Sequence, residues 1–152
     1  MNKLCINLPL KKRFEFLEHT ADVYVVAYGE TLEQAFENAA LATFETMTDT
    51  EKVEPKTEDT IEVEGYDEQA LLYNWLEELI IKFEITENLY SRFEISPIIK
   101  RPNGLKLKAK VWGELFNPNK HPQKVGIKAI TYHQMEILKK PNAVSVKFIL
   151  DI

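Results

Sequence analysis

Two stretches of the chain repeat apolar residues every three or four positions, which is the period of an α-helix. The first covers 31–47, where Thr31 and Gln34 have the spacing of a capping box. The second covers 67–84 and begins at Asp67, a residue type that often caps helices. The pattern predicts two amphipathic helices. Their apolar stripes are more typical of core faces than of a cofactor pocket.

Much of the remaining chain alternates apolar and polar residues, or concentrates β-branched and aromatic ones, as half-buried strands do. The pattern predicts strands at 14–19, 23–29, 60–65, 89–96, 97–112 (a hairpin turning at Asn103-Gly104), 125–138 and 144–152. Strands outnumber helices, and hairpin signals join several of them. We therefore expect an α+β fold, a single domain with two amphipathic helices packed on largely antiparallel β-sheet. The order of the strands does not follow from the pattern.

The last predicted strand, 144–152, alternates like a strand with one buried face and ends in two carboxylates. These are the side chain of Asp151 and the main-chain carboxyl group of Ile152, while Asp22 stands just before another predicted strand. Hard cations such as calcium and magnesium prefer oxygen ligands of this kind. If the two strands are neighbours, the carboxylates gather and need a cation or protons to neutralise them. Taken singly, Asp22 is more typical of a turn and Asp151 of a solvent-facing position.

Composition indicates the cellular compartment and the classes of partner to expect. The single cysteine, Cys5, cannot form an internal disulfide, which favours a reducing, intracellular compartment. No apolar run is long enough for a membrane helix, and the N-terminal stretch lacks the features of a signal peptide, so we expect a cytoplasmic protein with no membrane partner. A formal net charge of -5 at pH 7 gives no support to wholesale nucleic-acid binding.

Two groups of basic or titratable residues invite a functional interpretation. Lys106, Lys108 and Lys110 fall on one face of a predicted strand and could track phosphates. We favour a solvent face, or an edge strand that lysines protect from aggregation. His121 lies in the polar loop 117–124, and we expect it to be solvated.

The sequence contains no nucleophile constellation. It has no G-x-S-x-G, no H-E-x-x-H and no Gly-rich phosphate loop, and its histidines lack zinc-like spacing. An enzyme is therefore disfavoured. A metal-dependent phosphoester hydrolase acting on RNA stays open as an alternative, because a carboxylate-bound cation can activate water. His19 is the one plausible general base beside the acidic pair, which weakens that alternative.

Four segments taken together resemble the archease family in content and order: HTAD at 19–22, ALLYNWLEELI at 70–80, IKAITYH at 127–133 and FILDI at 148–152. The resemblance covers about residues 14–152, which would form an archease-like domain. Residues 1–13 would then be an N-terminal extension.

The resemblance implies a protein cofactor rather than an enzyme. Archeases assist the RtcB-type RNA ligase that joins tRNA halves after intron removal. They promote guanylylation of the ligase histidine by GTP and so allow multiple turnover, which makes tRNA an indirect partner. Some archeases are also linked to tRNA cytosine-5 methyltransferases as chaperones. The resemblance does not decide which partner dominates here.

The resemblance also implies a metal site. The family uses the Asp of its HTAD motif and the last two residues, and the matching positions here are Asp22, Asp151 and Ile152. Calcium is the metal expected from the resemblance, with magnesium or manganese as alternatives. Lys128 matches a basic position of the family, and Lys128 and His19 are the expected supporting or partner-contact residues.

Overall fold

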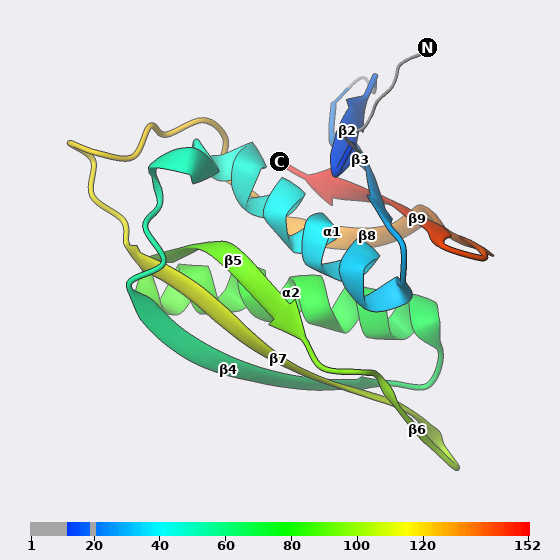
Figure 1. Cartoon of the computed structure of the whole chain (residues 1–152). Coiled ribbons are helices and arrows are strands. Elements are labelled where there is room, and N and C mark those ends of the chain that lie inside the picture. Colours follow the sequence, from blue (N-terminus) through cyan, green and yellow to red (C-terminus); the bar gives the residue numbers. More distant parts are fainter. Residues whose placement is uncertain (1–11, 19–20) are drawn as a thin grey trace.

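Two antiparallel sheets enclose two helices in the computed structural model, which describes residues 12–18 and 21–152 (Figure 1). The elements in chain order are β2 (Phe14–Leu17), β3 (Val23–Gly29), α1 (Leu32–Met47), the short 3₁₀ helix η1 (Thr50–Lys52), β4 (Thr57–Gly65), α2 (Glu68–Thr86), β5 (Asn88–Ile95), β6 (Ile99–Arg101), β7 (Gly104–Leu115), β8 (Ala129–Lys140) and β9 (Ala143–Asp151).

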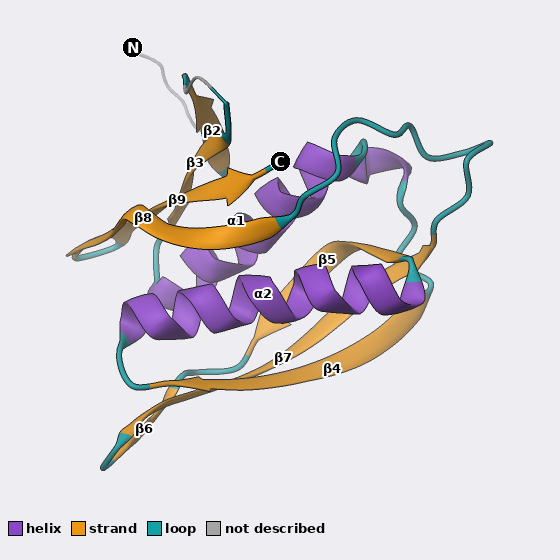
Figure 2. Cartoon of the chain, turned by 180° about the vertical axis from the view of Figure 1, so that it is seen from behind, coloured by secondary structure: helices purple, strands orange, loops and turns teal. Residues whose placement is uncertain are grey.

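The strands form two separate sheets. One sheet has the order β2-β3-β9-β8 and the other β4-β7-β5, with β6 paired to β7 as a hairpin. Helix α1 packs against β3, β9 and β5, whereas α2 packs against β4, β7 and β8, so each helix touches both sheets (Figures 1 and 2). The predicted α+β fold of two helices on antiparallel sheet is confirmed. The division into two sheets is what the sequence pattern left open.

The start of α1 follows local chemistry. Thr31 is the N-cap, and its side chain accepts a hydrogen bond from the Gln34 N–H at 3.1 Å. The Gln34 side chain accepts a hydrogen bond from the N–H of Glu30, one residue before the N-cap. In a standard capping box it would accept from the N-cap itself, so the second hydrogen bond of the predicted box is shifted by one residue. Gly29 ends β3 just ahead, where a Cβ atom would lie 2.4 Å from the main-chain nitrogen of Ala35. Only glycine permits this close strand-to-helix turn.

Both ends of helix α2 are capped by hydrogen bonds. Asp67 is the N-cap and accepts from the Ala70 N–H at 2.8 Å. The helix runs slightly past its predicted end to Thr86. There Glu87 takes a left-handed conformation (φ 60°) and its N–H donates to the Phe83 carbonyl. Within the described residues, no helix has the length and hydropathy needed to span a membrane.

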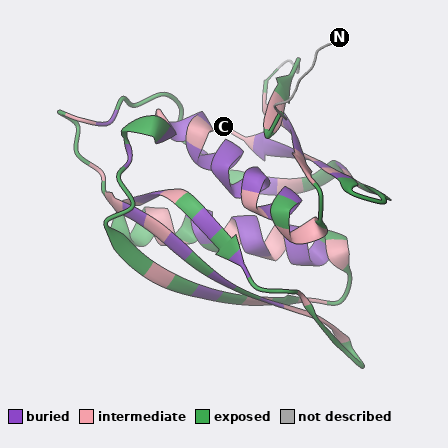
Figure 3. Ribbon diagram, in the orientation of Figure 1, coloured by how far each residue is buried: buried purple, intermediate pink, exposed green. Residues whose placement is uncertain are grey.

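The core lies between the sheets, where Figure 3 shows buried positions on the facing sides of helices and strands. The Trp75 side chain of α2 is fully buried, and its indole N–H donates to the Phe36 carbonyl of α1 at 2.9 Å. In β9, Phe148 and Leu150 are fully buried, each worth about 1.5–3 kcal/mol. Ile149 on the other face is only 1% exposed, so the prediction of one buried face for this strand was too narrow.

Two hairpin turns join neighbouring strands, and the predicted one is shifted by a residue. In the first, Arg101 pairs with Gly104, so the central residues are Pro102 and Asn103 rather than Asn103 and Gly104. Gly104 has φ 150°, a conformation that side chains rarely allow. In the second, Lys140 of β8 pairs with Ala143 of β9, so Pro141 and Asn142 form the turn, with Asn142 at φ 57°.

Candidate metal centre

The register of β3 and β9 brings the two predicted aspartates together. These strands are antiparallel, and Val23 pairs with Leu150. Continuing the register outward by one residue sets Asp22 opposite Asp151. Residues directly opposite in an antiparallel pair point to the same face, with Cα atoms roughly 4.5–5.5 Å apart. The predicted acidic pair requires the strand after Asp22 to lie beside the C-terminal strand. Figure 1 shows that β3 and β9 are neighbours.

Strand β8 adds a third segment from the other side. Ala129 pairs with Asp151, and the Lys128 N–H donates to the Asp151 carbonyl at 2.7 Å. The same register places Lys128 beside Ile152. Because β9 lies between β3 and β8, it gathers residues from three separate parts of the chain at one end of the sheet.

The residues that carry the carboxylates are packed at the end of the sheet. Asp22, Asp151 and Ile152 are all partly buried, and Ile152 packs against the hydrophobic core. Leu150, directly before Asp151, has no exposed surface. The positions of the carboxyl groups are therefore fixed by the core packing of β9, while the Lys128 side chain is exposed to solvent.

The donor chemistry fits a hard cation. Two aspartate side chains and the main-chain carboxyl group of Ile152 offer oxygen atoms, which suit calcium, magnesium or manganese. Opposed carboxylates on neighbouring strands repel each other, and a cation would remove this repulsion. Among the described residues, no three His, Cys, Asp or Glu side chains are placed to hold a metal ion. The candidate set therefore depends on the main-chain carboxyl group as its third oxygen ligand.

The structure describes only one of the two expected supporting residues, Lys128 and His19. The main chain of Lys128 lies beside that of Asp151, because the Lys128 N–H donates to the Asp151 carbonyl, and its side chain is exposed. His19 lies outside the described residues, so its proposed supporting role stays a prediction.

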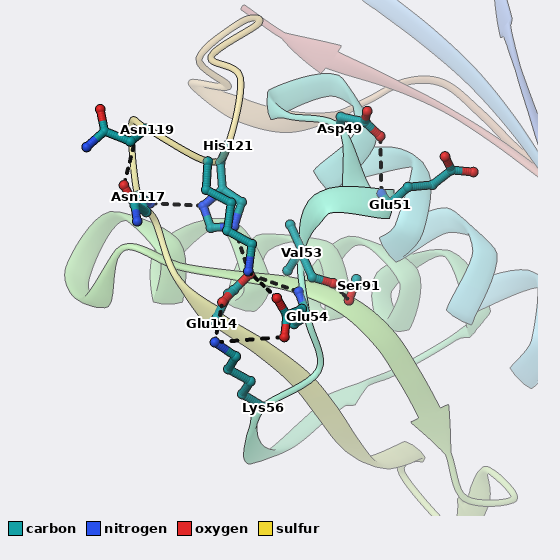
Figure 4. A network of polar contacts seen from close by, with 11 residues as sticks. Asp49, Glu51, Val53, Glu54, Lys56, Ser91, Glu114, Asn117, Asn119 and His121 are labelled. Atoms are coloured by element: carbon teal, nitrogen blue, oxygen red, sulfur yellow. Dashed lines mark hydrogen bonds and ion pairs between the residues drawn. The ribbon is translucent and has the colours of Figure 1, made fainter.

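A polar network near the end of β7 was not foreseen, and Figure 4 shows it. The expectation that His121 is solvated was wrong, because this residue is only 1% exposed. Its Nδ1 accepts from the Asn117 N–H at 2.9 Å, and its Nε2 lies 2.9 Å from the Glu114 carboxylate. Since Nδ1 is an acceptor, the ring proton sits on Nε2 and is donated to Glu114. Lys120 also contacts this carboxylate, at 2.7 Å.

The Glu114 carboxylate is held in its charged form. Burial raises its pKa, but hydrogen bonds from the Glu54 N–H, Lys120 and His121 outweigh burial and lower the pKa to about 2. The Lys120 pKa is raised in turn, by hydrogen bonds to Glu114 and Glu54. The network is thus a charged, hydrogen-bonded anchor at the start of the β7–β8 connection.

This anchor fixes the segment that leads to the candidate metal centre. After His121, the Lys124 side chain forms an ion pair with Glu45 of α1 at 2.7 Å. Ile127 is then buried in the core, directly before Lys128. Sequence reasoning missed the anchor because Asn, Pro and Lys around His121 are typical of a solvated loop, and no local spacing marks the histidine as buried.

The lysines of β7 form a solvent face with ion pairs. Strand β7 lies in the middle of its sheet, so the alternative of a protected edge strand was wrong. The Lys106 ammonium lies 3.1 Å from Glu62, and that of Lys110 lies 4.0 Å from Glu58. Lys108 and Lys110 are exposed, as the favoured interpretation expected.

Sequence comparisons place the chain among known proteins. The Archease protein family (MTH1598/TM1083) matches residues 14–152. "Protein archease" of Sulfurisphaera tokodaii is 48% identical over 141 residues, which cover 93% of this chain and 99% of that protein. "Protein archease" of Pyrococcus abyssi is 47% identical over 131 residues, covering 86% and 92%.

Structural comparisons agree with the sequence. The solution structure of Methanobacterium thermoautotrophicum protein 1598 has a TM-score of 0.81 and 41% identity, covering 92% of this chain and 99% of that one. A crystal structure from Thermotoga maritima, described as an archease and possible chaperone, has a TM-score of 0.56 over 96% and 100% of the chains. At 18% identity, the second likeness speaks for the fold alone. By sequence and by fold, the chain belongs to the archease family.

Proposed function

We propose that this chain is a metal-binding protein cofactor of an RtcB-type RNA ligase, acting in the cytoplasm. In this role it promotes guanylylation of the ligase by GTP and lets each ligase molecule complete many joining reactions on tRNA halves. Family membership over residues 14–152 supports the proposal. The observation that carries it is the register that sets Asp22 opposite Asp151.

Asp22, Asp151 and the main-chain carboxyl group of Ile152 are the proposed ligands. Calcium is the proposed metal, and magnesium and manganese suit the same oxygen donors. When bound, such a cation would supply positive charge that can attract a phosphate oxygen. The chain's own contribution is to hold the carboxylates on the rigid end of β9, where the main-chain N–H of Lys128 donates to the Asp151 carbonyl.

A second proposed partner is a tRNA cytosine-5 methyltransferase, toward which the chain would act as a chaperone. Membership of the archease family, some members of which are linked to such methyltransferases, supports keeping this partner. In contrast, no observation on the part of the chain described here favours a phosphoester hydrolase, so that alternative is not proposed.

A multiple-turnover ligation assay tests the proposal. Purified RtcB-type ligase, present in smaller amount than its substrate, joins tRNA halves that carry a cyclic phosphate, with GTP and calcium or manganese. We expect this chain to raise the number of joined molecules per ligase. The double variant Asp22→Asn/Asp151→Asn keeps the shape of both side chains and serves as the matched control. An unchanged turnover number with the parent chain would overturn the proposal.

A further inference from the structure

One face of α2 is covered by neither sheet, and Figure 2 shows this helix in front of the β4-β7-β5 sheet and below β8. Its outward residues are Glu77, Glu78, Ile81, Glu84 and Ile85, called here the α2 outer face. They share a face because each of the other four lies three or four positions from Ile81 along the helix. Ile81 is 40% exposed and Ile85 is 77% exposed. The α2 outer face therefore presents large apolar side chains to solvent, set among carboxylates.

Tyrosines extend this surface at the N-terminal end of the helix. Tyr66 is 78% exposed, and Tyr132 of β8 is 49% exposed. The ring of Tyr132 stacks on Tyr73 of α2, with centroids 4.3 Å apart and planes 2° from parallel. A bulge in β8, with Gln134 at φ 57°, interrupts its pairing with β9 at this point. Burial and the nearby Tyr66, Tyr73, Asp67 and Glu77 raise the Tyr132 pKa, so all of these groups share one neighbourhood.

The charge of the molecule is concentrated along α2. Residues 67–87 carry six acidic side chains against the single lysine Lys82, a formal charge of -5. The whole chain also has a formal charge of -5, so the remainder is neutral in sum. The negative field of the protein is therefore strongest around this helix.

Several charges on the outer side of the β4-β7-β5 sheet are paired, whereas, among the described residues, two carboxylates of the α2 outer face are not. On the outer side of the β4-β7-β5 sheet, Lys106 pairs with Glu62 at 3.1 Å and Arg92 with Glu94 at 2.7 Å. Glu78 and Glu84 form no ion pair with any residue in the described ranges. These carboxylates are consequently available to a cation from another molecule.

We propose that the α2 outer face docks on a basic, partly apolar surface of a partner protein. RNA, an anionic lipid surface and a second acidic helix face would each be repelled by the same carboxylates. Arginine fits both parts of the surface, because its guanidinium pairs with carboxylates and stacks on tyrosine rings. The choice of partner rests on the proposed function: an RNA ligase must carry basic surface to bind its substrate.

Binding of the full chain to purified RtcB-type ligase tests the docking surface. Glu78→Lys/Glu84→Lys should weaken binding about tenfold, mainly through slower association, because the steering charge is reversed. Ile85→Ser should weaken it about threefold or more, mainly through faster dissociation. Both variants should keep the parent's circular dichroism and unfolding temperature, since the altered side chains are exposed.

A matched control separates the surface from the net charge. Glu51→Lys/Glu58→Lys changes exposed residues away from α2 and gives the same overall charge as Glu78→Lys/Glu84→Lys. We expect this control to bind within about twofold of the parent.

The possible outcomes test the proposed docking surface separately from the proposed function. If the parent binds and stimulates the ligase but the α2 variants bind equally well, the docking surface is wrong and the proposed function stands. Equal weakening by the α2 variant and its control would also overturn the surface, because net charge alone would explain it. A parent chain that dimerises through this face, shown by an α2 variant that stays monomeric in sedimentation, would assign the face to self-association instead. A parent that neither binds nor stimulates overturns both proposals.

Discussion

Val23 pairs with Leu150 across β3 and β9, and continuing this register by one residue sets Asp22 opposite Asp151. A slip of one residue would send the two carboxylates to opposite faces of the sheet, because side chains alternate along a strand. It would also turn the fully buried Leu150 and Val25 away from the core. The hydrophobic core therefore holds the geometry of the acidic pair in place.

Removing either aspartate charge should weaken metal binding. Asp22→Asn and Asp151→Asn should each lower calcium affinity about tenfold or more, because a neutral amide replaces a charged oxygen ligand. Calorimetric titration with calcium and magnesium measures the effect, with Glu58→Gln on the other sheet as control. The unfolding temperature without metal controls for damage to the fold. An aspartate whose variant binds metal like the parent is not a ligand.

Extending the chain beyond Ile152 should act like the loss of a ligand. A peptide bond converts its carboxyl group into a neutral carbonyl, which is a weaker ligand for a hard cation. We expect a C-terminal tag to lower calcium affinity and ligase stimulation, while the same tag ahead of Met1 leaves both nearly unchanged. Unfolding temperature without metal controls for damage to the fold. Full activity and metal binding in the C-terminally tagged chain would remove Ile152 from the ligand set.

The Glu114–His121 anchor should contribute to stability in a pH-dependent way. Because the folded-state pKa of Glu114 is about 2 against an ordinary 4.5, its stabilisation is complete above pH 4.5 and is lost as the pH falls toward 2. Glu114→Gln should lower the free energy of unfolding by about 1–3 kcal/mol at pH 7. It should also flatten the acid dependence between those two pH values. Urea unfolding at several pH values measures both, and a variant with the parent's profile would contradict the anchor.

Neutralising the β7 lysines should leave cofactor activity intact. Lys106 and Lys110 pair with glutamates of β4, and exposed pairs of this kind contribute about 0–1 kcal/mol each. Replacing Lys106, Lys108 and Lys110 together by glutamine should therefore change neither ligase stimulation nor ligase binding appreciably. If stimulation collapses while ligase binding persists, the lysines contact RNA and the solvent-face interpretation is wrong.

Local chemistry made much of the fold predictable. Both helix starts were found because Thr31 and Asp67 act on backbone N–H groups only three residues away. Hairpin turns were found for the same reason, although the β6–β7 turn shifted by one residue. The division into two sheets depends on pairings between distant segments, such as β3 with β9, and no local pattern encodes it.

The candidate site was predictable only in part, for the same physical reason. The sequence could say that Asp22 and Asp151 would meet if their strands were neighbours, and resemblance to a family supplied the expectation of a metal. The burial of His121 depends on Glu114 seven residues earlier, at the end of another element. The stacking of Tyr132 on Tyr73 depends on a bulge that alternation alone does not reveal.

Guanylylation of the ligase histidine tests the role of the acidic pair most directly. Ligase that has completed one round of joining, and so has lost its bound guanylate, is mixed with labelled GTP and calcium or manganese. The nucleotide bound covalently to the ligase is then measured with the parent chain, with Asp22→Asn/Asp151→Asn, or with neither. We predict that the parent raises the rate of guanylylation and that the double variant, folded as judged by circular dichroism, leaves it at the rate of ligase alone. Equal stimulation by the double variant, or no stimulation by the parent, would contradict the proposed metal-dependent cofactor.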